Sequence, residues 1–442
     1  MPEYFPENNT PLWSDTEVRS LQKISSSLDS LSTGGAGGII GSFPTDAFGR
    51  LKVANPFTLF DSSHRYRDNG LWSTYTSGTA SETFNASQGL VDLTIGSTNG
   101  DELIRETTKV FSYQPGKSLL FMSTFIMNPA KTNLRQRIGY FGDDNGIYIE
   151  LSGNTVSLVE RSLVTGSPTE SQVLQADWNG DRLDGTGPSG ITLDLTKAQI
   201  FWSDIEWLGV GTVRVGFVID GKFITCHSFH HANLISSTYI TTASLPLRYE
   251  IKNIGTPSPA TSSTLKQVCS TVISDGGYQL SGSQQAIGTP VATPKTLTTA
   301  STYYPVVSLR LKASPDRLDA IVILTAASIL PLPSSGSPNH NWRIVATGTT
   351  TGGTWVSAGV DSAVEYNITG TSFSGGRILA SGFLGTSNQS TAGVDILKEA
   401  LFKSQLERNG LTGAPFELTL VVGASANNAS VLASLDWEEI SR

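Results

Sequence analysis

The chain has 442 residues, more than one hydrophobic core usually supports, so we expect two folded domains. Only 15% of the residues are charged, against roughly 25% in an average soluble protein, and Gly, Pro, Ser and Thr fill the difference. The net charge of -8 comes without a run of Lys or Arg, which argues against nucleic acid as a partner. No segment approaches the ~18 apolar residues of a spanning helix, so no membrane insertion is expected.

The first residues carry neither the positive charge nor the apolar stretch of a secretory signal, so we expect synthesis in a cytoplasm. The only two cysteines are Cys226 and Cys269. Two thiols cannot form a disulfide framework for a chain of this size, and we predict that both are buried and free.

Residues 1–45 are predicted to form an N-terminal arm with a helix over about 14–31. Ser14 and Glu17 have the spacing of a capping box, which satisfies the first free amides of a helix. Its apolar residues recur at coiled-coil spacing for about two heptads. They are Leu21, Ile24, Leu28 and Leu31. The helix either anchors the chain to sister subunits or a neighbouring protein, or docks on its own domain.

Residues 46–282 contain many short segments rich in Val, Ile, Phe, Tyr and Thr, separated by Gly, Asn, Asp or Pro. Strands without intervening helical patterns predict an antiparallel β-sandwich. The segments 143–146 and 219–222 contain Asn-Gly and Asp-Gly, which favour tight hairpins, so each is predicted to join two strands.

Residues 283–301 are poor in large apolar residues and include Pro290 and Pro294, so we predict a linker there. Residues 302–442 are predicted to form a second β-sandwich. The segment 394–410 is the one plausible helix in it, because it ends in the Asn-Gly pair typical of a helix C-cap. The predicted fold class is therefore mainly β, with two jelly-roll-like sandwiches behind a helical arm.

Three histidines, His227, His230 and His231, lie beside Cys226, and imidazole and thiolate are zinc ligands. On a strand, however, His227 and His231 point to one face and His230 to the other. Hydrogen-bonded histidines are the favoured interpretation, and no cofactor is predicted.

The segment DWNGDRLDG offers the oxygen-rich side chains that calcium prefers. It departs from the EF-hand pattern, because Arg182 replaces the glycine and Pro188 replaces the final glutamate. A turn stabilised by Asx hydrogen bonds is the favoured interpretation, and a calcium site is the alternative. Its weak candidate ligands are Asp177, Asn179, Asp181 and Asp184.

Asp204 and Glu206 share one face of a predicted strand, which is the minimum that a glycosidase pair requires. Such spacing is common by chance, and no Gly-x-Ser-x-Gly, P-loop or His-Glu-x-x-His motif occurs. We therefore predict that the chain is not an enzyme. Trp202 and Trp207 flank the pair and are weak candidates for stacking on a sugar, although packing in the core is the favoured interpretation.

The segment TDAFGRLKVANPFTLFDSSHRYRDN, at 45–69, resembles a signature near the start of virion structural proteins of tailed bacteriophages of aquatic bacteria and cyanobacteria. Residues 184–233, together with LPLRYEI at 245–251, are similar to a second region of the same family. The resemblance implies a virion protein whose first domain is a concanavalin-type jelly roll, a fold used for sugar binding and as plain architecture. It supplies no catalytic motif.

From these features we expect a virion subunit for assembly and host attachment, in the tail, baseplate or a fibre. It is expected to form a homo-oligomer, a trimer, and to contact other virion proteins. The alternatives are a protein that decorates the capsid or forms a head fibre, and a tail protein that binds or depolymerises a host surface glycan. Rigid sandwiches suit all of these roles because their end loops can vary without disturbing the cores.

Overall fold

The computed structural model describes residues 56–279, 281–333, 337–386, 392–394 and 405–441. The chain divides into two units, 1–53 and 54–442, and the described residues all belong to the second. The predicted arm helix, with Leu21, Ile24, Leu28 and Leu31, lies outside the described residues. None of the described helices is long and apolar enough to cross a membrane.

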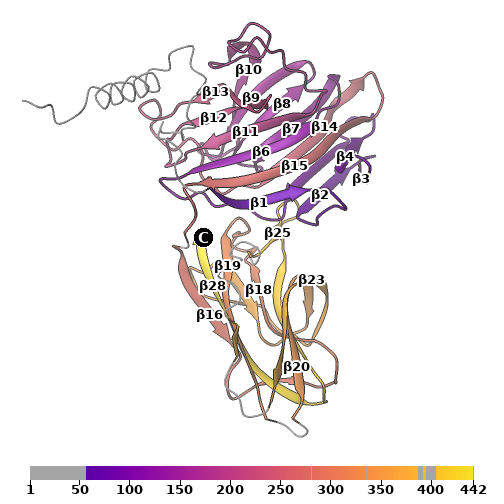
Figure 1. The fold of residues 1–442 in the computed structure, drawn as a ribbon, viewed down its shortest axis with the longest axis vertical. Helices are drawn as coiled ribbons and strands as arrows, with labels where there is room; N and C mark the ends of the chain where they lie inside the picture. The colour runs from indigo at the N-terminus through magenta and orange to yellow at the C-terminus, as the bar shows by residue number, and fades with distance from the viewer. Residues whose placement is uncertain (1–55, 280, 334–336, 387–391, 395–404, 442) are drawn as a thin grey trace, which may run out of the picture. The chain divides into compact units, whose positions relative to one another are not determined.

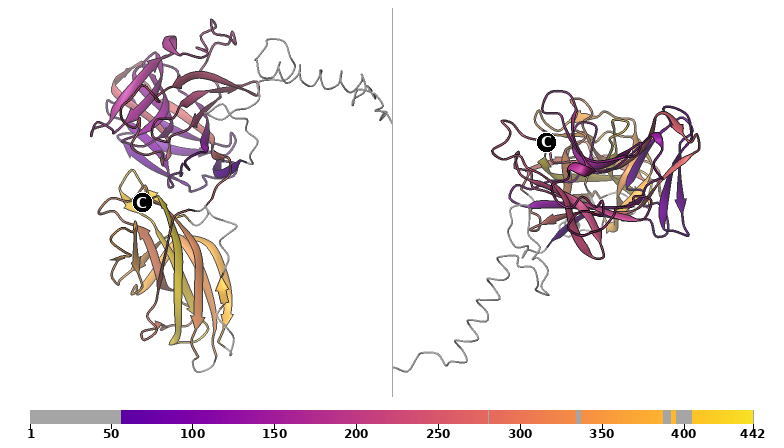
Figure 2. Two further views of the ribbon diagram at one scale, coloured as in Figure 1. Left: turned by 90° about the vertical axis from the view of Figure 1, so that its left-hand side faces the viewer. Right: turned by 90° about the horizontal axis from the view of Figure 1, so that it is seen from above.

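The predicted fold class is confirmed, because the described residues form two antiparallel β-sandwiches (Figures 1 and 2). One layer of the N-terminal sandwich is an eight-stranded sheet in the order β13-β12-β11-β6-β15-β4-β3, with β1 also paired to β15. Its strands are β1 (Phe57–Ser63), β3 (Ser81–Asn85), β4 (Leu90–Ile95), β6 (Ser118–Ile126), β11 (Gln199–Ile205), β12 (Val213–Ile219), β13 (Lys222–Phe229) and β15 (Ser263–Asp275).

The opposite layer is a seven-stranded sheet in the order β10-β9-β8-β7-β14-β5-β2. Its strands are β2 (Trp72–Ser77), β5 (Glu102–Thr107), β7 (Thr132–Phe141), β8 (Gly146–Ser152), β9 (Thr155–Ser162), β10 (Thr169–Leu174) and β14 (Leu247–Ser258). A short 3-10 helix, Gln175–Asp177, follows β10.

Alternation along each strand places one set of side chains between the two layers. Phe121 and Phe201 come from the eight-stranded sheet, while Ile138, Tyr140 and Tyr249 come from the other, and all five are fully buried. Phe121 stacks on Tyr140 with ring centroids 5.6 Å apart, so the core joins the sheets through aromatic contacts.

The C-terminal sandwich packs a five-stranded sheet against a six-stranded one. The five-stranded sheet contains β16 (Ser283–Gly288), β17 (Lys295–Leu297), β19 (Ile321–Pro331), β24 (Ala392–Val394) and β28 (Ala429–Ser441). The six-stranded sheet contains β18 (Tyr304–Leu311), β20 (Asn339–Thr351), β21 (Val356–Ser357), β22 (Val364–Asn367), β23 (Ser372–Gly385) and β27 (Glu417–Ala424). A separate two-stranded ribbon pairs β25 (Arg408–Asn409) with β26 (Ala414–Pro415).

Arg408, in that ribbon, makes buried contacts with the N-terminal sandwich. Its guanidinium lies 2.8 Å from the Glu106 carboxylate and donates to the Thr107 carbonyl at 2.7 Å. Val110 of the N-terminal sandwich also packs with Ile321 of the C-terminal sandwich in a small apolar cluster. Because these groups are buried, loss of the contact between Arg408 and Glu106 would leave a buried charge without its partner.

Both hairpin predictions are confirmed. The segment 143–146 joins β7 to β8, and 219–222 joins β12 to β13. In the second hairpin Asp220 and Gly221 have φ values of 51° and 72°, the left-handed backbone that a two-residue turn requires.

Three expectations need correction. The predicted linker, 283–301, contains β16 and β17, because its small polar residues pair as strands with β28. Cys269 is exposed rather than buried, since it lies on the outer face of β15, whereas Cys226 is buried. In the segment predicted as a helix, 394–410, the described ends are extended strand residues, and the rest lies outside the described residues.

Candidate functional site

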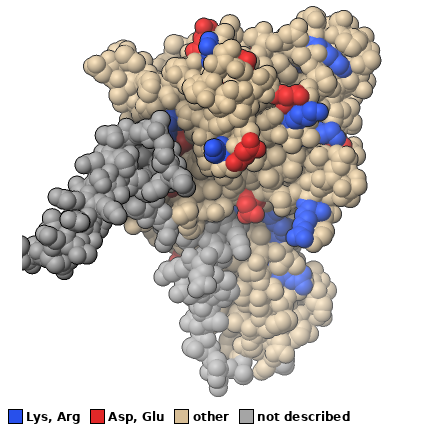
Figure 3. All heavy atoms as spheres, turned by 45° about the horizontal axis from the view of Figure 1, so that its top comes forward, with Lys and Arg blue, Asp and Glu red and all other residues tan. Residues whose placement is uncertain are grey.

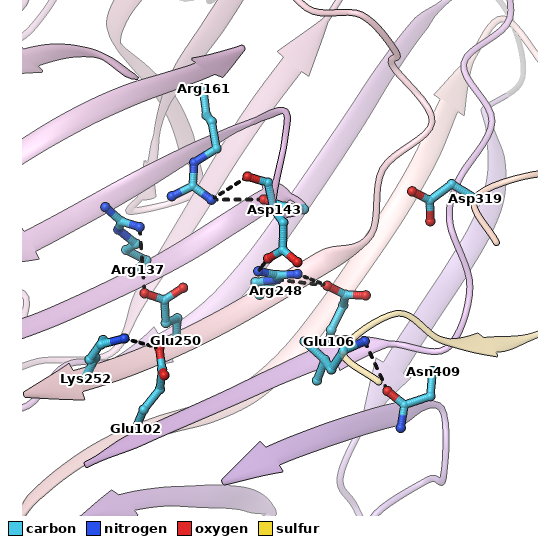
Figure 4. A network of polar contacts seen from close by, with 12 residues as sticks. Glu102, Glu106, Arg137, Asp143, Arg161, Arg248, Glu250, Lys252, Asp319 and Asn409 are labelled. Atoms are coloured by element: carbon cyan, nitrogen blue, oxygen red, sulfur yellow. Dashed lines mark hydrogen bonds and ion pairs between the residues drawn. The ribbon is translucent and has the colours of Figure 1, made fainter. Parts of the chain in front are cut away.

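The outer face of the seven-stranded sheet carries a layer of paired charges (Figure 4). Strand register places Arg137 on β7 between Glu250 on β14 and Glu150 on β8. Its Nε donates to Glu150 Oε2 at 2.6 Å, and its Nη1 lies 3.7 Å from Glu250 Oε1. The other charges of this face are paired similarly: Arg248 with Glu106 and Asp143, Lys252 with Glu102, and Arg161 with Glu170.

The arginines also cover the aromatic side chains of this face. The Arg137 guanidinium lies 5.1 Å from the Tyr148 ring centroid, and that of Arg161 lies 5.2 Å from the same ring. Burial tends to raise the pKa of Glu170, but the hydrogen bond from Arg161 and the charge of Arg137 outweigh it and lower that pKa. The charges of this face therefore neutralise one another.

A different region, at one end of the N-terminal sandwich, forms a cavity of about 580 Å³. Three chain segments that follow β5, β11 and β13 contribute to it, through Tyr113, Trp207 and Thr241 respectively. Backbone hydrogen bonds hold these segments together. Phe111 N donates to the Leu245 carbonyl at 3.1 Å, which joins the loop after β5 to the loop after β13. This volume lies within the 300–1,000 Å³ typical of small-molecule sites.

Trp207 is held in place at the wall of the cavity. Its Nε1 donates to the Ile240 carbonyl at 3.2 Å, and its ring meets the Tyr113 ring edge-on, with centroids 6.2 Å apart. The turn after it closes with Gly211 N bonded to the Trp207 carbonyl at 2.8 Å. A Cβ at Gly211 would lie 2.0 Å from the Glu206 carbonyl oxygen, so only glycine fits this turn.

The polar groups of the cavity are mainly neutral. Lys117 Nζ donates to Gln114 Oε1 at 3.0 Å, and Gln279 N donates to the same oxygen at 3.1 Å. Burial lowers the pKa of Lys117. Hydroxyls complete the lining, from Ser112, Thr241, Thr242, Ser244 and Ser281. None of the described residues that line the cavity is Asp or Glu.

The structure separates the two tryptophans that the sequence singled out. Trp207 lines the cavity, whereas Trp202 is only 3% exposed and packs edge-on against Phe223, with ring centroids 5.3 Å apart. Trp202 lies mid-strand on the outer face of β11, while Trp207 lies beyond the end of that strand. No signal in the sequence marks Tyr113, because it comes from a loop more than ninety residues away.

The four oxygen-bearing candidates for calcium are used in the local loop structure. Asp181 accepts backbone hydrogen bonds from Leu183 at 2.9 Å and Ser189 at 2.7 Å. Asn179 bonds Ser228, Asp184 accepts from Thr186, and Asp177 ends the 3-10 helix. Burial tends to raise the pKa of Asp181, and the backbone hydrogen bonds outweigh it. Among the described residues there is no group of three or more His, Cys, Asp or Glu that could hold a metal ion.

The three histidines have separate partners. His227 Nδ1 accepts from Asn179 N at 3.2 Å, and His230 Nδ1 lies 3.3 Å from the Thr212 hydroxyl. His231 has an acceptor at each ring nitrogen. Nδ1 lies 2.6 Å from the Gly211 carbonyl and Nε2 lies 2.8 Å from the Glu160 carboxylate.

Asp204 and Glu206 are both buried, and Asp204 forms an ion pair with Arg214. Neither carboxylate lines a described cavity.

Comparisons with known proteins were made for the whole chain. No protein-family model matches it, and no curated protein sequence matches it. Many solved structures are similar in fold. A protein of unknown function from Shewanella oneidensis MR-1 is 10% identical, with a TM-score of 0.33, and the match covers 62% of this chain and 100% of that one.

Two further matches each cover 49% of this chain. The carbohydrate recognition domain of Emp47p is 10% identical, with 96% of that chain covered and a TM-score of 0.31. A beta-1,3-glucanase from Mycobacterium marinum is also 10% identical, with 98% of that chain covered and a TM-score of 0.33.

The prediction that the chain is not an enzyme is contradicted by these comparisons, because the beta-1,3-glucanase and other glycosyl hydrolase family proteins are among the similar structures. Likeness at this level concerns the fold alone, so no substrate or catalytic residue is transferred to this chain.

Proposed function

We propose that this chain is a virion attachment subunit of a tailed bacteriophage and that it binds a host surface carbohydrate in the cavity beside Trp207. The observation that carries the binding proposal is the combination in one cavity of a fixed tryptophan ring with amide and hydroxyl groups. An aromatic ring contacts the C–H face of a sugar, while amides and hydroxyls bond its hydroxyl groups.

The charge of the cavity favours the same class of ligand. Its described lining offers one ammonium group, Lys117, and no carboxylate. An ammonium has three donors, and the Lys117 ammonium donates to Gln114 and to the Gly277 carbonyl, at 3.0 and 3.1 Å. One donor therefore remains for a neutral or acidic sugar.

Sequence features support the virion part of the proposal. The segment 45–69 resembles the signature of phage structural proteins, and two sandwiches present connecting loops at their ends, where recognition surfaces commonly lie. On the described part of the face in Figure 3, basic and acidic side chains are interspersed, so this face carries no basic patch of the kind that nucleic acid binds. Placement in the tail, baseplate or a fibre is preferred to capsid decoration because the cavity suits attachment.

Binding to an array of bacterial lipopolysaccharide and capsular oligosaccharides tests the glycan proposal. We expect the full chain to bind at least one of them and Trp207→Ala to lose about tenfold or more in affinity. Trp202→Phe is the matched control, because that tryptophan lies outside the cavity, and it should bind normally. Absence of binding by the full chain, or full binding by Trp207→Ala, would contradict the proposal.

Two measurements test the assembly. Immunogold labelling of purified phage particles with an antibody to this chain should decorate the tail, and unlabelled particles would refute the virion proposal. Mass photometry of the full chain should give a trimer, and a monomer would refute self-assembly. Release of shorter sugars from a bound polysaccharide would identify the protein as a depolymerase.

A further inference from the structure

A second, smaller cavity of about 230 Å³ lies in the C-terminal sandwich, where β20 begins and β27 ends. Strand register places Asn341 of β20 opposite Phe383 of β23 on one side and opposite Gly423 of β27 on the other. Directly paired residues share a face of a sheet, so these three positions lie side by side on the same surface.

The walls of this cavity are aromatic and its floor is a glycine. A Cβ at Gly423 would lie 3.4 Å from the Tyr303 ring and 3.2 Å from the Thr302 carbonyl oxygen, so the missing side chain leaves the hollow open. Phe383 lies on the edge strand β23 and is 82% exposed. Removing exposed apolar surface from water is favourable, so the Phe383 ring offers a contact surface for the apolar face of a ligand.

The polar groups around the rings are held in fixed positions. The Tyr303 hydroxyl donates to Asn341 Oδ1, and Asn341 Nδ2 donates to the Gly382 carbonyl at 2.8 Å. The Arg343 guanidinium lies 4.0 Å from the Tyr303 ring centroid and its Nε donates to Asn341 Oδ1 at 3.3 Å. The site is therefore organised before any ligand arrives, which lowers the entropy cost of binding.

The rim adds a further amide. Two hydrogen bonds of 2.9 Å join Asn339 and Ser425: Asn339 N donates to the Ser425 side-chain hydroxyl, and Ser425 N donates to the Asn339 carbonyl. The Asn339 side-chain amide has no hydrogen-bond partner among the described residues. It can therefore donate to and accept from a hydroxyl group.

We propose that this cavity is a second carbohydrate site, which holds a single neutral hexose-type residue against Phe383. Its volume of about 230 Å³ is below the roughly 300–1,000 Å³ of drug-sized ligand pockets, which limits the ligand to a small group such as one sugar ring. None of its described lining residues is Asp, Glu, Lys or Arg, and the neighbouring Arg343 guanidinium is engaged by the Tyr303 ring and Asn341, which favours an uncharged ligand. The proposal does not depend on the cavity beside Trp207, because the two share no residue.

Saturation-transfer difference NMR on the full chain tests it, with glucose, galactose, mannose, rhamnose and N-acetylglucosamine as separate probes. We expect at least one sugar to give a signal that Trp207→Ala retains and that Phe383→Ala weakens by about tenfold in affinity. Tyr66→Ala is the matched control, because that ring is 81% exposed and lines no described cavity. It should leave the signal unchanged.

A second variant guards against a change in folding. Gly423→Ala places a methyl group on the floor, 3.2 Å from the Thr302 carbonyl oxygen, and should abolish the signal while circular dichroism shows that the variant still folds. If none of the five sugars gives a signal, or if every signal survives Phe383→Ala, the second site does not exist. If every signal instead disappears with Trp207→Ala alone, sugar binding belongs to the first cavity only.

Discussion

The charged face of the seven-stranded sheet and the cavity beside Trp207 use polar residues in opposite ways. On the sheet face, buried arginines and carboxylates such as Arg137 and Glu150 are partners of one another. In the cavity, amides and hydroxyls surround an aromatic ring, and none of the described lining residues is a carboxylate. The first arrangement uses its charges within the fold, whereas the second leaves neutral groups for a ligand.

If the cavity is the binding site, as we propose, density of charge is a poor guide to binding in this chain. A buried ion pair costs several kcal/mol in desolvation, and its attraction roughly offsets that cost only while both partners are present. Neutral hydrogen-bonding groups can stay exposed to water at a much smaller cost in free energy. They therefore remain available to bind a ligand. The following predictions test this contrast.

Replacing Arg137 by Ala is expected to give the largest effect. The change leaves Glu150 buried without its cationic partner, while Glu250 keeps its ion pair with Arg135 at 2.8 Å, and we expect a loss of about 3–5 kcal/mol in the free energy of unfolding. Urea denaturation measures it. The control is Arg182→Ala, which removes an exposed pair with Asp184 at 3.7 Å and should cost under about 1 kcal/mol. Equal costs for the two variants would show that the sheet face is not a structural network.

Replacing Gly211 by Ala should have an intermediate effect on stability and a strong effect on binding. The new Cβ would meet the Glu206 carbonyl, so the turn must shift and carry Trp207 with it. We expect a cost of about 1–3 kcal/mol and loss of glycan binding. Gly359→Ala, where the nearest atom to a new Cβ is 3.8 Å away, is the control. If Gly211→Ala still binds the glycan, Trp207 is not part of the binding site.

The smallest expected effect is a dependence of stability on pH through His231. Burial lowers the pKa of His231, but the hydrogen bond and charge of Glu160 and the Gly211 carbonyl outweigh it and raise that pKa above 6.5. A raised pKa stabilises the fold fully below 6.5, and this contribution is lost as the pH rises through the folded-state pKa. The melting temperature should therefore fall by a few degrees over that range.

His231→Gln tests this assignment, because glutamine keeps a polar side chain and does not titrate. The pH slope of its melting temperature should be shallower than that of the unaltered chain by the contribution of His231. An unchanged slope would show that other groups cause the pH dependence. Because the Gly211 turn carries Trp207, glycan binding should weaken over the same range of pH.

The sequence was sufficient for the fold class and for local turns. Asp220-Gly221 predicts its hairpin because the turn depends on two backbone angles of adjacent residues. The error at 283–301 has the opposite cause. The residues of β16 and β17 are small and polar. These strands form only because they pair with β28, which lies more than a hundred residues later in the chain. Exposure of Cys269 likewise depends on a bulge in β15.

The candidate site was only partly predictable. Trp207 could be named as a sugar-stacking residue because tryptophan is a typical aromatic platform, but the same argument named the buried Trp202. The two tryptophans differ because Trp207 lies beyond the end of β11, where Tyr113 and Thr241 from distant loops line the same cavity. Tertiary contacts of this kind leave no local pattern in a single sequence.

The most direct test of the central claim is 19F NMR of the full chain labelled with 5-fluorotryptophan. The chain has eight tryptophans, and the Trp207→Phe and Trp202→Phe variants assign two of the resonances. Titration with the oligosaccharide that binds best on the array should shift the Trp207 resonance and leave that of Trp202 unchanged. A bound glycan that leaves the Trp207 resonance in place would contradict the account.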